Sequence, residues 1–149
     1  MTGVPSGAGR PEHEVTVARE PGLPVGDFLG LAQRVWPGDH AEALVDRALR
    51  RTLNVTARRD GVLVGCVRVL TDGYFLGIVT EILVDPDHQR QGIGRRLMEV
   101  AWEASPTGWY FGAQPGREGF FERCGFERAL TGFARRKPRP AADPGPGEG

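Results

Sequence analysis

The feature that most constrains this fold is an apolar run followed by two closely spaced glycines and a helix pattern. The segment reads "LVDPDHQRQGIGRRLM" and covers residues 83–98. Gly92 and Gly94 lie where the helix should begin. Glycine is costly there because it loses more backbone freedom on folding than any other residue. The sequence therefore predicts a turn whose backbone must come close to something with no side chains in between.

This turn has the properties of an anion-binding site. Free N–H groups and the helix dipole attract anions to a helix N-terminus, and Arg90, Arg95 and Arg96 add positive charge. The alternative is that the glycines only make a tight strand-to-helix connection. A dinucleotide fingerprint is excluded because its third glycine is replaced by Leu97, and the Gly-Lys-Ser/Thr of a mononucleotide loop is missing.

The rest of the pattern predicts one α/β domain with a central, mixed and twisted sheet flanked by helices. Strands are expected at 15–20, 53–60, 62–70, 74–84, 108–114 and 126–136. Helices are expected at 24–36, 41–52, 93–104 and 117–124. The predicted order is β-α-α-β-β-β-α-β-α-β, and 149 residues suit a single domain.

Composition limits the partners and the setting of the chain. Segments 1–14 and 137–149 are rich in Gly and Pro and are predicted to be disordered, which leaves 15–136 as the domain. Zero net charge argues against nucleic acid, and the lack of a long apolar run argues against a membrane. Cys66 and Cys124 do not suggest a disulfide framework, and the isolated histidines do not suggest a metal site. A reduced, cytoplasmic setting is expected.

Two motifs resemble the GNAT superfamily of acyl-CoA-dependent N-acetyltransferases. Residues 89–94, "QRQGIG", resemble its Q/R-x-x-G-x-G/A signature. Residues 119–127, "GFFERCGFE", resemble its second signature, an aromatic pair followed by Glu-x-x-Gly-Phe. The order of elements agrees as well, so the resemblance covers about 15–136. The "LVDP" strand, with a carboxylate three residues before Val84, further resembles small-amine, arylalkylamine-like members.

The resemblance implies acetyl-CoA as the cosubstrate and no metal. In this family the strand before the glycine loop splays from its neighbour, and the pantetheine arm pairs with the exposed main chain. The loop then holds the pyrophosphate. Gln114 falls where the family has an asparagine that contacts pantetheine, and Phe121 is expected near the thioester or, alternatively, in the core. The implied cofactor-binding residues are Ile82, Leu83, Val84, Gln89, Arg90, Gln91, Gly92, Ile93, Gly94, Arg95, Gln114 and Phe121.

Glu81 is the candidate catalytic base because it is the only ionisable residue of 78–84. The period of a strand places it on the face of Val79 and Leu83, where desolvation would raise the pKa of its carboxyl group. A raised pKa suits a general base. The alternative is a structural ion pair, for example with Arg68.

The residue at the position of the usual proton donor differs from the family pattern. Many members carry a tyrosine where this chain has Phe121, which has no proton to give. Water, or no dedicated acid, is therefore expected to serve, with Cys124 and Tyr110 as the nearest alternatives.

The predicted function is direct transfer of an acetyl group from acetyl-CoA to a primary amine in a ternary complex. The alternative is a non-catalytic acyl-CoA-binding sensor or interaction module. The acceptor amine, the acyl-chain preference and the oligomeric state, a homodimer included, stay open.

Overall fold

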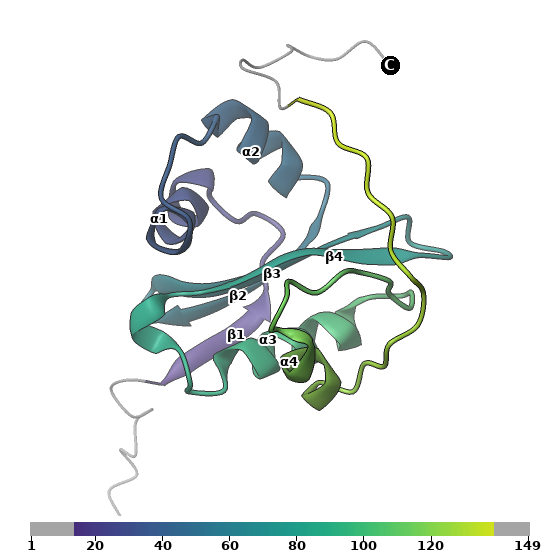
Figure 1. The fold of residues 1–149 in the computed structure, drawn as a ribbon. Coiled ribbons are helices and arrows are strands. Elements are labelled where there is room, and N and C mark those ends of the chain that lie inside the picture. The colour runs from purple at the N-terminus through teal and green to yellow at the C-terminus, as the bar shows by residue number, and fades with distance from the viewer. Residues whose placement is uncertain (1–13, 139–149) are drawn as a thin grey trace, which may run out of the picture.

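The computed structural model describes residues 14–138 as two helical layers on either side of a sheet (Figure 1). The strands are β1 (Val15–Arg19), β2 (Leu53–Arg59), β3 (Val62–Thr71) and β4 (Gly77–Val84). The helices are α1 (Val25–Val35), α2 (Glu42–Leu49), α3 (Ile93–Ala104) and α4 (Glu118–Arg123), with a 3-10 turn, η1, at Pro86–His88. α1 and α2 lie on one face of the sheet, and α3 and α4 lie on the other.

The sheet is an antiparallel meander with the strand order β1-β2-β3-β4. Asp60 and Gly61 both adopt positive φ angles, 52° and 79°, at the turn between β2 and β3. Two such residues match the right-handed twist of a hairpin, and an Asp-Gly pair favours this turn. The register between β3 and β4 shifts at Arg68/Val69, which marks a β-bulge.

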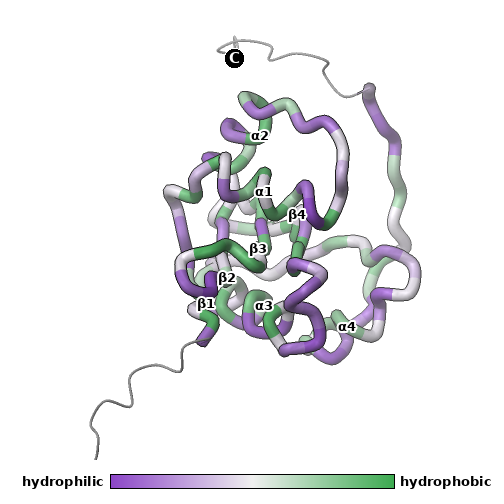
Figure 2. The backbone as a smooth tube through the Cα atoms, turned by 90° about the vertical axis from the view of Figure 1, so that its left-hand side faces the viewer, coloured by the Kyte–Doolittle hydropathy of each residue, from purple (hydrophilic) through white to green (hydrophobic). Residues whose placement is uncertain are grey.

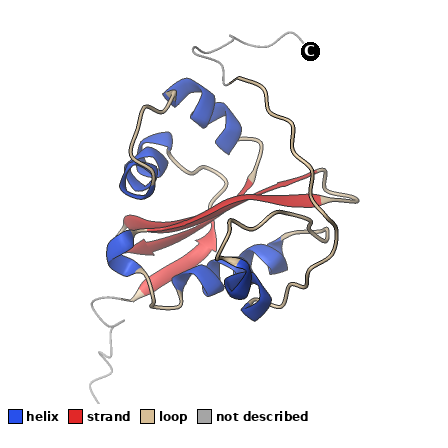
Figure 3. Cartoon of the chain, viewed as in Figure 1, coloured by secondary structure: helices blue, strands red, loops and turns tan. Residues whose placement is uncertain are grey.

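The two strands predicted at 108–114 and 126–136 are wrong. Within residues 14–138, the first segment forms only a single parallel bridge, between Trp109 and Gly77. Gly108 and Gly112 give it few side chains with which to hold a pleated strand. The second segment follows α4 as an exposed loop (Figure 3). The α/β class and the flanking helices are confirmed, and the sheet of the described residues is antiparallel rather than mixed.

The larger core lies between the sheet and α3. Its members are buried apolar side chains, including Val55, Val67, Val69, Leu97, Met98 and Ala101. The buried residues of α3 recur at helical spacing, as predicted. A smaller apolar cluster under α1 and α2 includes Phe28, Leu31, Leu49, Cys66 and Leu83. Figure 2 shows hydrophobic residues along the central strands and hydrophilic residues mostly in the connecting loops.

The terminal segments 1–14 and 137–149 lie almost entirely outside the described residues. Their disorder and the domain boundaries at 15 and 136 therefore stay predictions.

Candidate functional site

The outer edge of β4 opens just after its first residue. Gly77 N–H donates to Gly108 O at 3.0 Å, and Tyr110 N–H donates to Gly77 O at 2.9 Å. Within the described part of the chain, no further bridge joins β4 to the segment after α3. The edge of β4 over residues 78–84 therefore has no strand partner on this side, and we call it the open edge.

Alternation along the strand decides which peptide groups the open edge presents. Asp85 N–H donates to Val64 O at 2.8 Å, so the Asp85 amide faces β3. In an antiparallel strand the N–H and C=O of one residue point to the same side, and successive residues alternate between the two sides. The main-chain N–H and C=O of Ile82 and Val84 therefore point to the open edge, whereas those of Leu83 point to β3. Leu83 contributes a fully buried side chain instead, so only two of the three main-chain groups implied by the resemblance face outward.

The loop after β4 leads directly into a helix start with free N–H groups. Arg90 and Gly92 have positive φ angles, 63° and 77°, and Gly92 is the residue before α3. The first bond of the helix runs from Arg96 N–H to Gly92 O at 3.1 Å. The N–H groups of residues 93–95 consequently have no acceptor inside the helix, and the helix has no side-chain N-cap. This arrangement is the anion-binding geometry that the sequence predicts.

Gly92 and Gly94 of the loop are glycine for different structural reasons. Gly92 supplies the left-handed backbone conformation, which L-residues with a side chain rarely adopt. Gly94 lies against α4, and a Cβ there would be 3.2 Å from Phe120 Cζ. A tight connection therefore accounts for Gly94 without any ligand. The case for an anion rests instead on the free N–H groups.

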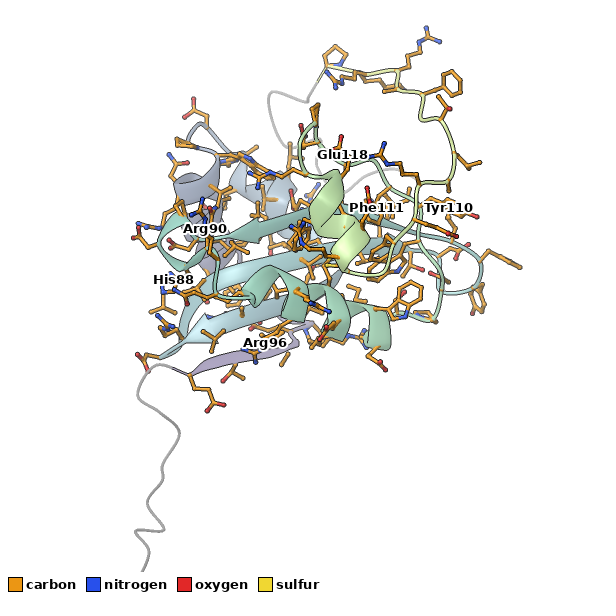
Figure 4. All side chains as sticks on the ribbon, turned by 60° about the horizontal axis from the view of Figure 1, so that its bottom comes forward. His88, Arg90, Arg96, Tyr110, Phe111 and Glu118 are labelled. Carbon is orange, nitrogen blue, oxygen red and sulfur yellow. The ribbon has the colours of Figure 1, made fainter. Side chains whose placement is uncertain are left out.

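The three arginines near the loop do not share one role. Arg90 is exposed beside His88 at the turn before α3, while Arg96 lies next to β1 (Figure 4). Arg96 Nη2 donates to Val15 O at 3.0 Å and thus ties α3 to β1. Arg95 is exposed and forms a 3.4 Å ion pair with Glu99. Arg90 and Arg95 are therefore the cations of this group that remain for an anion at the loop.

The bulge in β4 corrects the predicted position of Glu81. Arg68 pairs with Glu81, but the next pair is Val69 with Val79, so Thr80 is the extra residue. Val79 consequently packs in the α3 core, whereas Leu83 packs under α1. Leu83 shares the α1 face with Glu81, as predicted, but the prediction that Val79 also shares it is wrong, because the extra residue at Thr80 reverses the alternation of side chains.

Glu81 forms an ion pair with Arg68 on the face covered by α1. The contact joins Arg68 Nη1 to Glu81 Oε1, and the two side chains are 12% and 19% exposed. Arg68 also lies over the Phe28 ring, with Cζ 5.6 Å from the centroid. The alternative that the sequence left open, a partnership with Arg68, is the arrangement observed.

Polar groups at the end of α2 hold this ion pair in place. Arg68 Nε donates to Thr52 Oγ1 at 3.3 Å, and Thr52 Oγ1 donates to Asn54 Oδ1 at 2.6 Å. Asn54 is buried and donates to Leu49 O at 2.8 Å. On the same face, burial raises the pKa of the Cys66 thiol to about 12, so Cys66 is not a nucleophile at neutral pH.

The structure does not bring every predicted residue to the open edge. Gln114 is exposed in the loop before α4, and its carbonyl accepts the Arg117 N–H at 2.9 Å. Phe121 is half-buried, with its ring centroid 4.7 Å from that of Phe111 and 5.1 Å from that of Phe120. Packing therefore accounts for Phe121, and a contact of Gln114 or Phe121 with a cofactor stays a prediction.

The two alternative acids, Cys124 and Tyr110, lie in different surroundings. Burial raises the pKa of the Cys124 thiol, and Arg95 only partly offsets this effect. Tyr110 is 56% exposed. In Figure 4, Tyr110 lies beyond Phe111 as seen from α4.

Sequence reasoning missed one group at the site, the pairing of Arg34 with Asp85. Arg34 lies in the last turn of α1, and its Nε is 2.6 Å from Asp85 Oδ2. Burial favours the neutral acid, but hydrogen bonds from Arg34 and the Asp87 N–H lower the pKa of Asp85 overall. The Asp-Pro pair at 85–86 signals a turn. Arg34, 51 residues away, carries no sequence signal for the contact.

Comparison with known proteins decides the family. Residues 51–128 match the family described as Acetyltransferase (GNAT) domain, which is more than half of the chain. The chain belongs to the GNAT acetyltransferase family. The resemblance inferred from residues 89–94 and 119–127 is therefore confirmed, and members of this family use acetyl-CoA.

Individual relatives agree with this assignment. The mycothiol acetyltransferase of Beutenbergia cavernae is 34% identical over 112 residues, which are 68% of this chain and 36% of the relative. That of Salinispora arenicola is 30% identical over 134 residues, 82% of this chain and 43% of the relative. The chain thus spans about two fifths of the length of these curated relatives. A GNAT-family acetyltransferase from Streptococcus pneumoniae superposes with a TM-score of 0.73 at 27% identity, covering 85% of this chain and all of the other.

The described residues offer neither a metal centre nor a membrane-spanning helix. No group of three or more His, Cys, Asp or Glu side chains within 14–138 is placed to hold a metal ion. None of the helices in that range has the length and apolar character needed to cross a membrane.

Proposed function

We propose that this chain transfers an acetyl group from acetyl-CoA directly to a primary amine within a ternary complex. The observation that carries the proposal is the open edge of β4, which runs into a helix start with free N–H groups. A ligand with an extended amide arm and a pyrophosphate matches both halves of this surface.

The cofactor would bind along the edge and the loop in sequence. The pantetheine amides pair with the outward peptide groups of Ile82 and Val84, as a peptide pairs with a sheet edge. The pyrophosphate accepts hydrogen bonds from the loop at residues 89–94 and the first turn of α3. Arg90 and Arg95 add positive charge around it.

Glu81 is the proposed base for the amine. Arg68 contacts Oε1, and no hydrogen-bond donor of residues 14–138 reaches Oε2, which is therefore available to a proton. The reaction also needs a polarised thioester carbonyl and a departing thiolate. Phe121 cannot protonate the thiolate. We assign that step to water, because a CoA thiol leaves far more easily than an amine.

An amine screen that follows release of the CoA thiol tests the proposal. Aliphatic amines and arylalkylamines form the panel, because the "LVDP" strand resembles arylalkylamine-like members. We expect turnover of at least one primary amine. When both substrates are varied, the double-reciprocal plots of initial rate should give intersecting lines. Parallel lines would indicate an acetyl-enzyme intermediate and would contradict direct transfer.

A non-catalytic acyl-CoA-binding module is the second candidate. Two observations favour it: Glu81 is already engaged by Arg68, and Phe121 replaces the usual acid. Tight acetyl-CoA binding with no turnover across the whole panel would favour this candidate over the enzyme.

The proposal also covers the cellular compartment and the oligomeric state of the protein. We place the protein in the cytoplasm, and its two free cysteines, Cys66 and Cys124, fit a reducing compartment. A homodimer is the assembly to test first. Sedimentation of the purified chain with and without acetyl-CoA measures it.

A further inference from the structure

We propose that Arg34 and Asp85 form a clamp that positions the cofactor loop from helix α1 and so increases the affinity for acetyl-CoA. The inference rests on the proposed function, because it assigns a positioning role toward the cofactor of that site. Neither residue is proposed to touch the reacting atoms.

The contact itself is a two-point, charge-assisted one. Arg34 Nε is 2.6 Å from Asp85 Oδ2, and Nη2 is 3.0 Å from Asp85 Oδ1. The same Nη2 is 2.7 Å from Asp87 Oδ2. Bidentate guanidinium–carboxylate pairs hold geometry as well as charge. The Asp85 side chain is 9% exposed, so its carboxylate depends on this partner.

Asp85 joins three parts of the backbone at the start of the loop. Its N–H donates to Val64 O at 2.8 Å, which ends the pairing of β4 with β3. Its carbonyl accepts the His88 N–H at 2.8 Å, and its carboxylate accepts the Asp87 N–H at 2.9 Å. These bonds shape η1, the turn that precedes the loop.

The position of the clamp explains why it should matter for the cofactor. Val84, immediately before Asp85, presents its main-chain N–H and C=O to the open edge, and the loop begins at Gln89, immediately after η1. The clamp therefore lies between the two proposed contact regions for acetyl-CoA. Loss of Arg34 leaves the buried Asp85 carboxylate with the Asp87 N–H and the His88 ring, whose Nδ1 is 3.8 Å from Asp85 Oδ1. We expect η1 to change shape and expose the carboxylate to water. The positive-φ residues Arg90 and Gly92 would move with that turn.

The other end of α1 offers a matched control. Arg58 on β2 contacts Glu20 at 2.7 Å and Asp27, in the first turn of α1, at 2.9 Å. Arg58 therefore also ties α1 to the sheet, through Asp27, and neither of its two carboxylate partners belongs to η1 or to the loop. The Arg58 side chain is 22% exposed and that of Arg34 is 49% exposed. Loss of Arg58 should therefore destabilise the fold at least as much as loss of Arg34.

The experiment measures acetyl-CoA affinity and stability on the full chain, by calorimetry and by urea unfolding. We expect Arg34→Ala to raise the Kd for acetyl-CoA about tenfold, because the loop is no longer held in the binding geometry. The turnover rate at saturating acetyl-CoA should change much less. Arg34→Lys should recover part of the affinity, since lysine keeps the charge but not the fork. Arg58→Ala should lose stability and keep the wild-type Kd.

A double-mutant cycle tests whether the two residues act together. Asp85→Asn keeps an acceptor for the Asp87 N–H but removes the charge. Once either partner is lost, removal of the other should add little, so the double variant should bind no more weakly than the worse single variant.

Three results would overturn the inference or its basis. A Kd of Arg34→Ala within twofold of wild type, with lowered stability, would leave the pair a purely structural contact. Equal weakening by Arg58→Ala would mean that any loosening of α1 has the same effect. Absence of acetyl-CoA binding to the wild-type chain would instead reject the proposed function, which separates the two failures.

Discussion

The two faces of the sheet are held by different forces. The face under α3 carries the larger apolar core. The face under α1 and α2 has a smaller apolar cluster, and three arginines of the described residues, Arg34, Arg58 and Arg68, pair there with carboxylates.

This difference suggests that one face mainly stabilises the fold and the other mainly positions the charged groups of the site. Burial of apolar surface is the dominant stabilising contribution to a fold, whereas a buried ion pair often contributes little net stability because both charges are desolvated. The α3 face should therefore hold the domain together. The face under α1 and α2 positions charges, among them the candidate base Glu81 and the clamp beside the loop.

The largest effect expected on the chemical side comes from Glu81→Gln. Loss of a general base typically lowers turnover about 10²–10⁴-fold, and the Kd for acetyl-CoA should change much less. Steady-state rates with the best amine of the panel measure the effect. Glu103→Gln, on the exposed side of α3, is the control. Near-wild-type turnover across the pH range would make Glu81 a structural residue.

The apolar face is tested by truncation of its core. Leu97 is fully buried under the sheet, and Leu97→Ala should lower the free energy of unfolding by about 2–5 kcal/mol. Leu31→Ala, in the smaller cluster, should lie near the lower end of that range. Urea unfolding measures both variants. A greater loss for Leu31→Ala would reverse the comparison of the two faces.

The two glycines should respond differently to alanine. Gly94→Ala places a methyl group 3.2 Å from Phe120 Cζ, and overpacking of this kind costs about 1–3 kcal/mol. Gly92→Ala has open space around its methyl group but requires a left-handed backbone, which costs about 1–2 kcal/mol. Phe120→Leu should rescue Gly94→Ala and leave Gly92→Ala unimproved. Equal rescue of both would show that crowding affects both positions.

Lowering the pH should reduce the contribution of the charged groups under α1 and α2 to the free energy of unfolding. Although burial opposes it, the hydrogen bond from Arg34 helps to lower the pKa of Asp85, and the hydrogen bond from Arg58 lowers that of Glu20. A carboxylate with a lowered folded pKa contributes its full stability above the unfolded pKa of about 4, and loses it as the pH falls through the folded value. Urea unfolding between pH 7 and pH 3 should show this fall, and Asp85→Asn should make it shallower. An unchanged slope would exclude Asp85 as a contributor.

The smallest effect is expected from Phe121→Tyr. A phenol at this position should leave turnover unchanged or raise it modestly, because water already protonates the thiolate under the proposed mechanism. Cys124→Ala and Tyr110→Phe should each keep most of the activity. A collapse of turnover in either, with acetyl-CoA binding intact, would identify the missing acid.

The parts of the fold that local patterns encode could be predicted from the sequence. The apolar stripe of α3 and the Asp60–Gly61 hairpin depend on residues close together in the chain, as does the helix start behind Gly92. The family followed from two short motifs for the same reason.

Other features depend on contacts between distant segments. A β-bulge appears only when two strands are aligned, so the face of Glu81 could not be read from the period of β4 alone. Likewise, segments 108–114 and 126–136 fit a strand pattern, yet Trp109 and Phe111 of the first each pack against Phe126 of the second instead of pairing in the sheet.

The sequence by itself determined the class of the domain, its family and the loop that is proposed to meet the cofactor. Only the tertiary structure decided that Glu81 pairs with Arg68, that Gly94 accommodates Phe120 and that Arg34 reaches Asp85 across 51 residues. The reason is physical: backbone conformation and helix periodicity are set by near neighbours, whereas register, packing and ion pairing are set by the way the layers meet.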